Sequence, residues 1–321
     1  GGNYKLARGM RSHITPGHLD DVSFGGVVNG KPSDGEHSWL IPTDNWDDIQ
    51  DWHWATQLQQ AQAMRFGVEH MRGLAPVNAG ALIWQLNDDW PVVSWAAVDF
   101  NGHRKPVWYA SRDFFAPRLA TIQPRTSEEY RETHSWEGVK VDTDHLELIV
   151  LNDTNTPWSG SWKVSRVDFD GNVLATQEIA DVELDAASHK GYPLNDEIVD
   201  FDDANNELII AVPSDDSFAR VIYNPAEILT QELVAPAQAF STQAERTADG
   251  VELTVTANDY VRDLFCMVDK VDEKATVEEG LVSLLPGESV TFHIGTDYAG
   301  DPNDFAAANV LRSANDLKRD F

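Results

Sequence analysis

The sequence contains one cysteine and no long hydrophobic run. Cys266 has no second cysteine to pair with, so an internal disulfide is excluded, and a lone thiol suits a reducing compartment. We therefore expect a cytoplasmic protein. No apolar stretch approaches the roughly 20 residues that cross a bilayer, which predicts a soluble globular chain.

Positive charge is also scarce. Lys and Arg total 24 against 53 Asp and Glu, which gives a net charge of −29. Such a chain repels nucleic acid phosphates and anionic membrane surfaces, so we expect neither as a partner. His13, His18 and His37 fit no closed zinc pattern, and Cys266 lies far from them in the sequence. The sequence indicates no metal and no cofactor.

Tryptophan is absent from the chain after Trp162. All 11 tryptophans lie between Trp39 and Trp162, so we expect aromatic binding chemistry in the first half. The 321 residues suffice for two or three domains with separate cores. The chain opens on Gly1 without an initiator methionine or a leader pattern, and we expect that a preceding segment is missing.

The first part of the chain has a helical pattern after a long loop. Residues 1–45 are rich in Gly, Pro, Asp and Ser, which predicts a loop. Apolar residues then recur at steps of three and four, which predicts a helix over residues 46–73 with Asp44 or Asn45 as its cap. We expect the apolar stripe of this helix to pack on the strand that follows.

An apolar run with a polar end follows this helix. Residues 80–86 have the length and composition of a buried central strand. Tryptophans, an asparagine and two aspartates come next, at the predicted carboxyl end, where parallel α/β folds place their sites. Residues 105–115 predict a second helix with Pro106 in its first turn. Its predicted buried side comprises Trp108, Tyr109, Phe114 and Phe115.

From Arg118 onward the pattern is all-β. Short strands separated by turn clusters predict a β-sandwich and then a second, smaller one, with a short helix near residues 305–317 in the tail. The predicted strands are residues 146–151, 161–169, 172–179, 207–212, 219–223, 238–244, 251–257, 261–267 and 289–294. The predicted domains are residues 1–117, 118–233 and 234–321.

The polar turn after residue 86 offers two kinds of candidate site residue. Asp88 and Asp89 are adjacent carboxylates, but neighbours on one strand end point to opposite sides. They do not readily form the pair, about 5–5.5 Å apart, that retaining glycosidases use, and hydrogen bonding and capping are the favoured roles. The flat faces of Trp84, Trp90 and Trp95 suit the apolar faces of sugar rings, although core packing explains such residues equally well.

Several strings of residues resemble a known family. Trp84-Gln85-Leu86-Asn87-Asp88-Asp89-Trp90-Pro91-Val92 and Lys105-Pro106-Val107-Trp108-Tyr109-Ala110 resemble the last strand and helix of the catalytic barrel in family 2 glycoside hydrolases of β-mannosidase type. Leu284-Leu285-Pro286-Gly287-Glu288 fits the same family. The resemblance covers nearly the whole chain. It implies an α/β part, the terminal helix-strand-helix segment of a (β/α)8 TIM barrel, and an all-β part of two immunoglobulin-like β-sandwich domains.

The resemblance also implies an activity. Members of this family are retaining, exo-acting enzymes that hydrolyse terminal non-reducing β-D-mannose residues from mannosides and manno-oligosaccharides. One glutamate acts as acid/base and another as nucleophile, and neither motif occurs here, so we expect both glutamates upstream of Gly1 and expect this chain to be inactive alone. By its match, Trp84 would line the mannose subsite, and Asn87, Asp88 and Trp90 would shape its rim.

A second hypothesis is a non-catalytic carbohydrate-binding or assembly module, because the tryptophan-rich first half could bind glycan without cleaving it. The expected partner is the β-mannoside substrate of the intact enzyme, and homo-oligomer formation is left open. A barrel strand without its neighbours has exposed edges. We therefore expect the first 115 residues either to pack on the first sandwich in a non-barrel arrangement or to associate with another chain.

Overall fold

The computed structural model describes residues 27–28, 31–32, 48–78, 80–126 and 145–317. The chain divides into two compact units, and each is discontinuous in sequence. Among the described residues, the terminal unit comprises 27–28, 31–32, 48–64, 84–110 and 226–317, and the middle unit comprises 65–78, 80–83, 111–126 and 145–225. The three domains that the sequence suggests, with boundaries after residues 117 and 233, stay a prediction.

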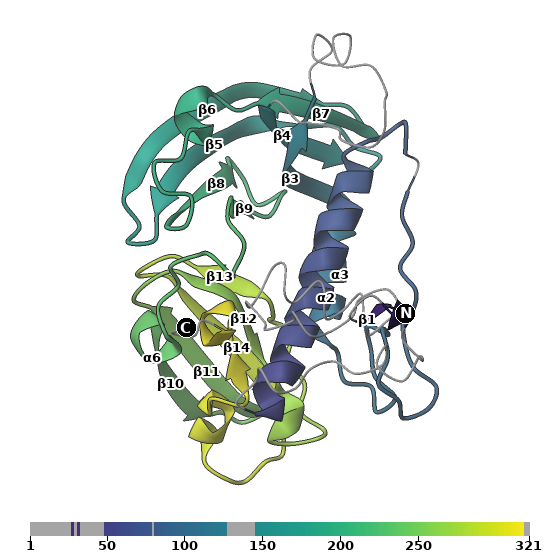
Figure 1. The fold of residues 1–321 in the computed structure, drawn as a ribbon, viewed down its shortest axis with the longest axis vertical. Coiled ribbons are helices and arrows are strands. Elements are labelled where there is room, and N and C mark those ends of the chain that lie inside the picture. Colours follow the sequence, from purple (N-terminus) through teal and green to yellow (C-terminus); the bar gives the residue numbers. More distant parts are fainter. Residues whose placement is uncertain (1–26, 29–30, 33–47, 79, 127–144, 318–321) are drawn as a thin grey trace. The chain divides into compact units, whose positions relative to one another are not determined.

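The middle unit contains two antiparallel sheets. One has the order β3-β4-β7, from β3 (Arg118–Arg125), β4 (His145–Asn152) and β7 (Ser188–Pro193). The other has the order β6-β5-β8-β9, from β5 (Trp158–Asp168), β6 (Val173–Leu184), β8 (Glu207–Pro213) and β9 (Val221–Tyr223). Leu148, Trp162 and Ile209 belong to one core cluster, so side chains of both sheets pack together as in a sandwich. The strands of the two sheets can be followed in Figure 1. The short helix α5 (Asp196–Val199) adds Ile198 to this core.

The terminal unit contains two three-stranded sheets. One has the order β10-β11-β14, from β10 (Phe240–Arg246), β11 (Gly250–Ala257) and β14 (Ser289–Gly295). The other has the order β13-β12-β15, from β12 (Val261–Cys266), β13 (Val282–Leu284) and β15 (Leu311–Arg312). Short helical turns connect them: α6 (Pro236–Ala239), η2 (Val268–Lys270), η3 (Pro302–Ala306) and η4 (Ala314–Leu317). The first residues that the structure describes are two short antiparallel strands, β1 (Val27–Val28) and β2 (Lys31–Pro32).

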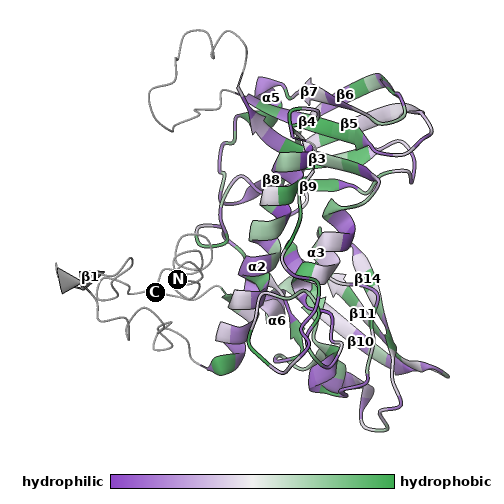
Figure 2. Cartoon of the chain, turned by 90° about the vertical axis from the view of Figure 1, so that its right-hand side faces the viewer, coloured by the Kyte–Doolittle hydropathy of each residue, from purple (hydrophilic) through white to green (hydrophobic). Residues whose placement is uncertain are grey.

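The predicted first helix is α2 (Ile49–Arg72). The carboxylate of Asp48 accepts hydrogen bonds from the backbone N–H groups of Gln50 at 2.8 Å and Asp51 at 3.0 Å, so Asp48 caps the helix. The proposed caps Asp44 and Asn45 lie outside the described residues. Figure 2 shows hydrophobic and hydrophilic residues mixed along α2, and its buried residues Trp54, Leu58 and Ala61 recur at steps of four and three, as on one face of an amphipathic helix.

The apolar stripe of α2 does not pack on a following strand, as predicted, but on the terminal sheets. Trp54 is fully buried, stacks on Phe265 of β12 with ring centroids 6.1 Å apart, and donates its indole N–H to the carbonyl of Ser313 at 2.7 Å. Leu58 and Ala61 are buried on the same stripe. The prediction failed because periodicity identifies the buried face of a helix but not its partner.

The predicted buried strand at residues 80–86 is wrong. The segment belongs to no strand, and exposed residues alternate along it, with Leu82 exposed at 99% and Trp84 at 77%. An apolar run becomes a buried strand only where neighbouring strands supply hydrogen-bond partners and cover both faces. Within the part of the chain that the structure describes, no strand lies in register with this segment.

The second predicted helix is confirmed as α3 (Pro106–Phe114), and Tyr109 and Phe114 are buried as expected. Phe115, which we expected on the buried side, follows the last helical residue and is 41% exposed. The predicted helix at residues 305–317 is instead η3, β15 and η4 in succession. Phe305 and Leu317 are buried there, so the tail packs on the terminal unit, although it does not form the predicted continuous helix.

The expected packing of the first 115 residues on the first sandwich holds only in part. Residues 65–83 and 111–115 cluster with that sandwich, whereas 48–64 and 84–110 cluster with the terminal sheets. No helix among the described residues is long and apolar enough to cross a membrane.

Candidate functional site

The predicted site residues lie in a loop of the terminal unit between α2 and α3, which we call the Trp loop (residues 84–105). Its two arms run side by side. The N–H of Val98 donates to the carbonyl of Leu86 at 2.8 Å, and the N–H of Asp88 donates to the carbonyl of Val98 at 3.1 Å. The N–H of Lys105 donates to the carbonyl of Ala97 at 3.0 Å and closes the loop onto the start of α3. Backbone pairing therefore gives this irregular segment a defined shape.

Asp88 is the buried polar centre of the Trp loop. Both of its carboxylate oxygens accept from the Ser94 hydroxyl at 2.7 Å, and Ser94 Oγ in turn accepts from the N–H of Ala96 at 3.0 Å. Lys105 Nζ donates to the carbonyl of Ser94 at 3.2 Å. Burial lowers the pKa of Lys105, an effect that the nearby carboxylates of Asp88 and Asp99 oppose. Asp88 therefore holds the loop together, as the hydrogen-bonding interpretation predicts.

The neighbouring carboxylates do not form an acid-base pair. Asp88 is buried and Asp89 is exposed, so the two side chains lie on different sides of the backbone. This is the arrangement that an extended backbone imposes on adjacent residues. Asn87, the other polar residue of the predicted rim, is exposed and donates from its side chain to the carbonyl of Asp88 at 3.1 Å.

Three tryptophans project from the loop into solvent. Trp84, Trp90 and Trp95 are 77%, 63% and 60% exposed, so none of them belongs to the core of this chain. The carbonyl of Trp95 accepts from Gln60 Nε2 of α2 at 2.7 Å, which attaches the loop to the helix. Exposed indole rings on a defined backbone are suited to stacking against a flat, partly apolar ligand.

A pair that the sequence patterns did not single out lies at the end of the Trp loop. Asp99 Oδ1 accepts from the backbone N–H groups of Asn101 and His103, and Asp99 Oδ2 lies 2.9 Å from His103 Nδ1. His103 Nε2 lies 2.9 Å from the carbonyl of Glu273 in the terminal unit. The signal in the sequence was an Asp and a His four residues apart around Asn101-Gly102, a spacing that an Asx-type turn brings together.

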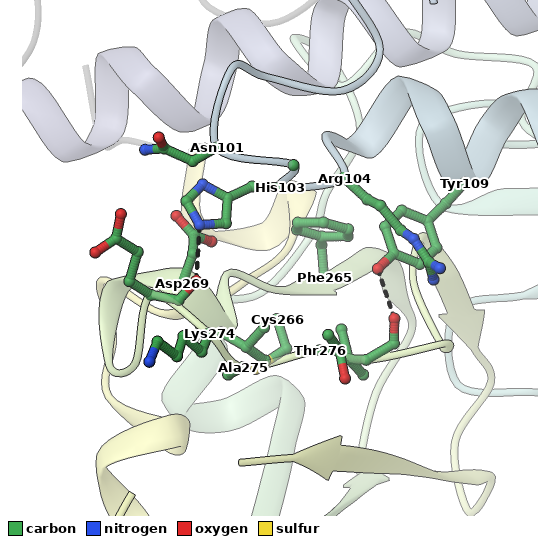
Figure 3. A pocket seen from close by; sticks show the side chains of 14 residues that line it. Asn101, His103, Arg104, Tyr109, Phe265, Cys266, Asp269, Lys274, Ala275 and Thr276 are labelled. Atoms are coloured by element: carbon green, nitrogen blue, oxygen red, sulfur yellow. Dashed lines mark hydrogen bonds between the residues drawn. The ribbon is translucent and has the colours of Figure 1, made fainter. Parts of the chain in front are cut away.

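His103 lines a cavity of about 300 Å³ within the terminal unit (Figure 3). Phe265 lines it between His103 and Tyr109, and Tyr109 donates its hydroxyl to the carbonyl of Val277 at 2.8 Å. Arg104 lies 4.3 Å from the ring centre of Trp108 and pairs with Glu278 at 2.7 Å. Hydrogen bonds from Tyr109 to Val277 and between His103 and Glu273 join residues of the wall, whereas Arg104 pairs with Glu278, which does not line the cavity.

No group of three or more His, Cys, Asp or Glu side chains is arranged to hold a metal ion within the described residues. His13, His18 and His37, the histidines of the opening loop, lie outside them. Glu69 of α2 accepts from the Thr121 hydroxyl at 2.7 Å, and burial raises its pKa against the opposing effect of Arg65. Its contacts give it a structural role in the middle unit.

The fold is similar to parts of two solved structures. Over 78% of its length the chain is similar to the β-D-mannosidase from Dictyoglomus thermophilum, with a TM-score of 0.61, 21% identity and 28% of that chain covered. It is also similar to the exo-chitosanase CsxA of Amycolatopsis orientalis, with a TM-score of 0.51, 16% identity, 84% of this chain and 34% of that one. The mostly β-sheet architecture with few helices is shared.

Sequence comparison points to one kind of enzyme within this class. The chain is 34% identical over 119 residues to β-mannosidase B of Aspergillus niger, and 37% identical over 92 residues to β-mannosidase B of Aspergillus flavus. These matches span 35% and 28% of this chain, and only 13% and 10% of the relatives. No protein-family model matches the chain. The resemblance to β-mannosidases is therefore confirmed, over a part of their length.

Proposed function

We propose that the chain is the C-terminal portion of a retaining, exo-acting β-mannosidase, which hydrolyses terminal non-reducing β-D-mannose residues from mannosides and manno-oligosaccharides. In this proposal the segment from α2 to α3 is the last part of a (β/α)8 TIM barrel, and the sheets that follow are two immunoglobulin-like sandwiches. The observation that carries the proposal is the string from Trp84 to Val92. It resembles the corresponding string of β-mannosidases, and its tryptophans are exposed to solvent.

Trp84 would form the wall of the mannose subsite, with Asn87, Asp88 and Trp90 at its rim. The exposure of Trp84 supports this role, because a stacking platform needs a free ring face. Asp88 would act through the backbone shape that its Ser94 contact maintains rather than by touching sugar.

Retaining hydrolysis requires two carboxyl groups about 5–5.5 Å apart, one as nucleophile and one as acid/base. Asp88 and Asp89 do not supply them, since one is buried against Ser94 and the other is exposed on the opposite side. The proposal therefore assigns both catalytic glutamates to residues upstream of Gly1 and predicts that the 321-residue chain has no hydrolytic activity.

The test uses p-nitrophenyl β-D-mannoside and two proteins: this chain, and the product of the reading frame extended upstream of Gly1. We expect hydrolysis only by the longer protein, and a loss of about 10- to 100-fold in kcat/KM for its Trp84→Ala variant, as removal of one stacking contact suggests. Val173→Ala, at an exposed position of β6, is the matched control and should leave kcat/KM unchanged. Turnover by the 321-residue chain would contradict the assignment.

A non-catalytic carbohydrate-binding module is the second candidate, and the three exposed tryptophans are the observation that favours it. It predicts that the longer protein binds manno-oligosaccharides, loses binding on Trp84→Ala, and hydrolyses none of them. Titration calorimetry alongside the hydrolysis assay separates the two functions.

A further inference from the structure

His103 makes two contacts that only its charged form can satisfy together. Nδ1 faces a carboxylate oxygen of Asp99 and Nε2 faces the backbone carbonyl of Glu273, both at 2.9 Å. An ionised carboxylate and a carbonyl oxygen only accept hydrogen bonds. A neutral imidazole carries one N–H and can donate to only one of them, whereas an imidazolium donates to both.

The surroundings favour the charged ring. Burial lowers the pKa of His103, but the bonds to Glu273 and Asp99 and the charges of Asp99 and Asp269 raise it above its usual range overall. The charged and titratable groups around it are Asp99 and Arg104 on its own loop, Asp269, Glu273 and Lys274 on the facing segment, and His53 and Lys270 beside Asp269. Arg104 is held by Glu278, and Lys270 Nζ donates to Gln50 Oε1 and the carbonyl of Asn309.

The two partners of His103 lie on different segments of the terminal unit. Asp99 is in the Trp loop, four residues after Trp95, and the N–H of Asp99 donates to the carbonyl of His103 at 3.0 Å. Glu273 follows η2, after β12. The ring therefore ties the Trp loop to the segment beyond β12, across one wall of the cavity in Figure 3.

We propose that His103 is a positioning residue that, when protonated, fastens the Trp loop to the carbonyl of Glu273, and that its deprotonation releases this attachment. The neutral ring has a single N–H, which stays on Nδ1 because the ionised carboxylate of Asp99 is a stronger acceptor than the carbonyl of Glu273. The bond to Glu273 is then lost, so the end of the loop gains freedom as the pH rises. The proposal concerns the described loop alone and does not rest on β-mannosidase activity.

Asp99→Asn provides the decisive variant. The asparagine Oδ1 can still accept from the N–H groups of Asn101 and His103, while its amide donates to His103 Nδ1. The neutral ring then carries its proton on Nε2 and still donates to Glu273, so both contacts are satisfied without charge. The attachment should become independent of pH, a result that simple loss of a structural carboxylate would not give.

The experiment measures hydrogen-exchange protection factors of the amides of residues 96–105 in the 321-residue chain between pH 5.5 and 8.5. Protection factors correct for the intrinsic pH dependence of exchange. We expect protection of the wild-type loop to fall at least tenfold with a midpoint above pH 6.5, His103→Ala to be unprotected throughout, and Asp99→Asn to stay protected throughout. His145→Ala, which removes a histidine paired with Glu147 in the middle unit, is the control and should match the wild type.

Ring nitrogen chemical shifts of His103 provide the second readout. The wild-type ring should be doubly protonated at pH 6, and the Asp99→Asn ring neutral with its proton on Nε2. Near-ultraviolet circular dichroism confirms that each variant is folded. Titration of the His103 ring without a change in loop protection, or an unprotected loop in Asp99→Asn at every pH, would overturn the proposal.

Discussion

Trp54 uses both its ring and its N–H inside the terminal unit. The ring stacks on Phe265, and the N–H donates to the carbonyl of Ser313, next to the last turn that the structure describes. A single side chain of α2 therefore contacts both a sheet and the C-terminal tail.

Two substitutions of Trp54 should separate these contributions. Trp54→Ala removes the buried ring and should lower the free energy of unfolding by about 3–5 kcal/mol. Trp54→Phe keeps an aromatic ring but leaves the carbonyl of Ser313 unpaired, and should cost about 1–3 kcal/mol. Urea unfolding measures both. Trp90→Ala, at an exposed ring, is the control, and a cost as large as that of Trp54→Ala would refute the packing account.

The sequence was enough to identify the candidate site residues around Trp84 and Asp88, but not to predict their exposure or their contacts. Local backbone geometry separates adjacent side chains, so the sequence alone is enough to reject Asp88 and Asp89 as a catalytic pair. The exposure of Trp84 and the contact between His103 and Glu273 depend on residues far away in the sequence, 170 positions apart in the second case. Composition carries no information on such partners.

At the scale of elements, β11 begins at a position that only glycine fits. Gly250 has φ 149° and lies opposite Gly295 of β14, and a side chain there would meet the backbone carbonyl of Ile294. The first residue pair of β11 and β14 thus depends on the absence of a Cβ atom at Gly250.

Gly250→Ala should therefore lower the free energy of unfolding by more than about 2 kcal/mol, because a backbone clash adds to the unfavourable φ. Gly287 has φ 83° but open space around its Cα, so Gly287→Ala should cost only about 1–2 kcal/mol. Equal costs in thermal or urea unfolding would show that backbone conformation alone, and not the approach of Ile294, determines the effect.

Elements with a local signal were predicted, and those that depend on distant partners were not. Strands β4, β5, β8, β11 and β14 have alternating or continuous apolar patterns bounded by turns, and all five were expected. Strands β3, β7, β13 and β15 were missed. Ser188–Pro193 of β7 is polar, β13 and β15 are three residues or fewer, and β3 has an arginine at each end and contains Pro124. The prediction of a strand at residues 80–86 was wrong for the opposite reason, because the local pattern is strong but no strand among the described residues pairs with it.

At the scale of the whole molecule, the net charge of −29 determines the electrostatic contribution to stability. Buried arginine side chains are already paired with carboxylates, as for Arg72 with Asp153 and Arg312 with Asp51. The surplus carboxylates repel one another in the compact state and are screened by salt. Glu245 and Glu252 illustrate this, since they lie directly opposite each other on β10 and β11.

The melting temperature should therefore rise by at least a few degrees between 0.05 and 2 M KCl. Glu245→Lys turns the repulsive pair into an attractive one and should raise the melting temperature at low salt while reducing the salt effect. Gln243→Lys, which adds positive charge less directly opposite Glu252, is the comparison. A melting temperature that is flat or falls with KCl would contradict the charge argument.

The hydrogen bond from Trp54 to Ser313 spans 259 positions, and this has a consequence for synthesis. At roughly 5–20 residues per second, the ribosome needs on the order of 10–50 s between these two residues. Residues 111–225 emerge earlier and hold the strands of the middle unit, which can form while translation continues. The contact between Trp54 and Ser313 cannot form until Ser313 has been synthesised, so the nascent chain leaves the indole N–H of Trp54 to water or to chaperones throughout that interval.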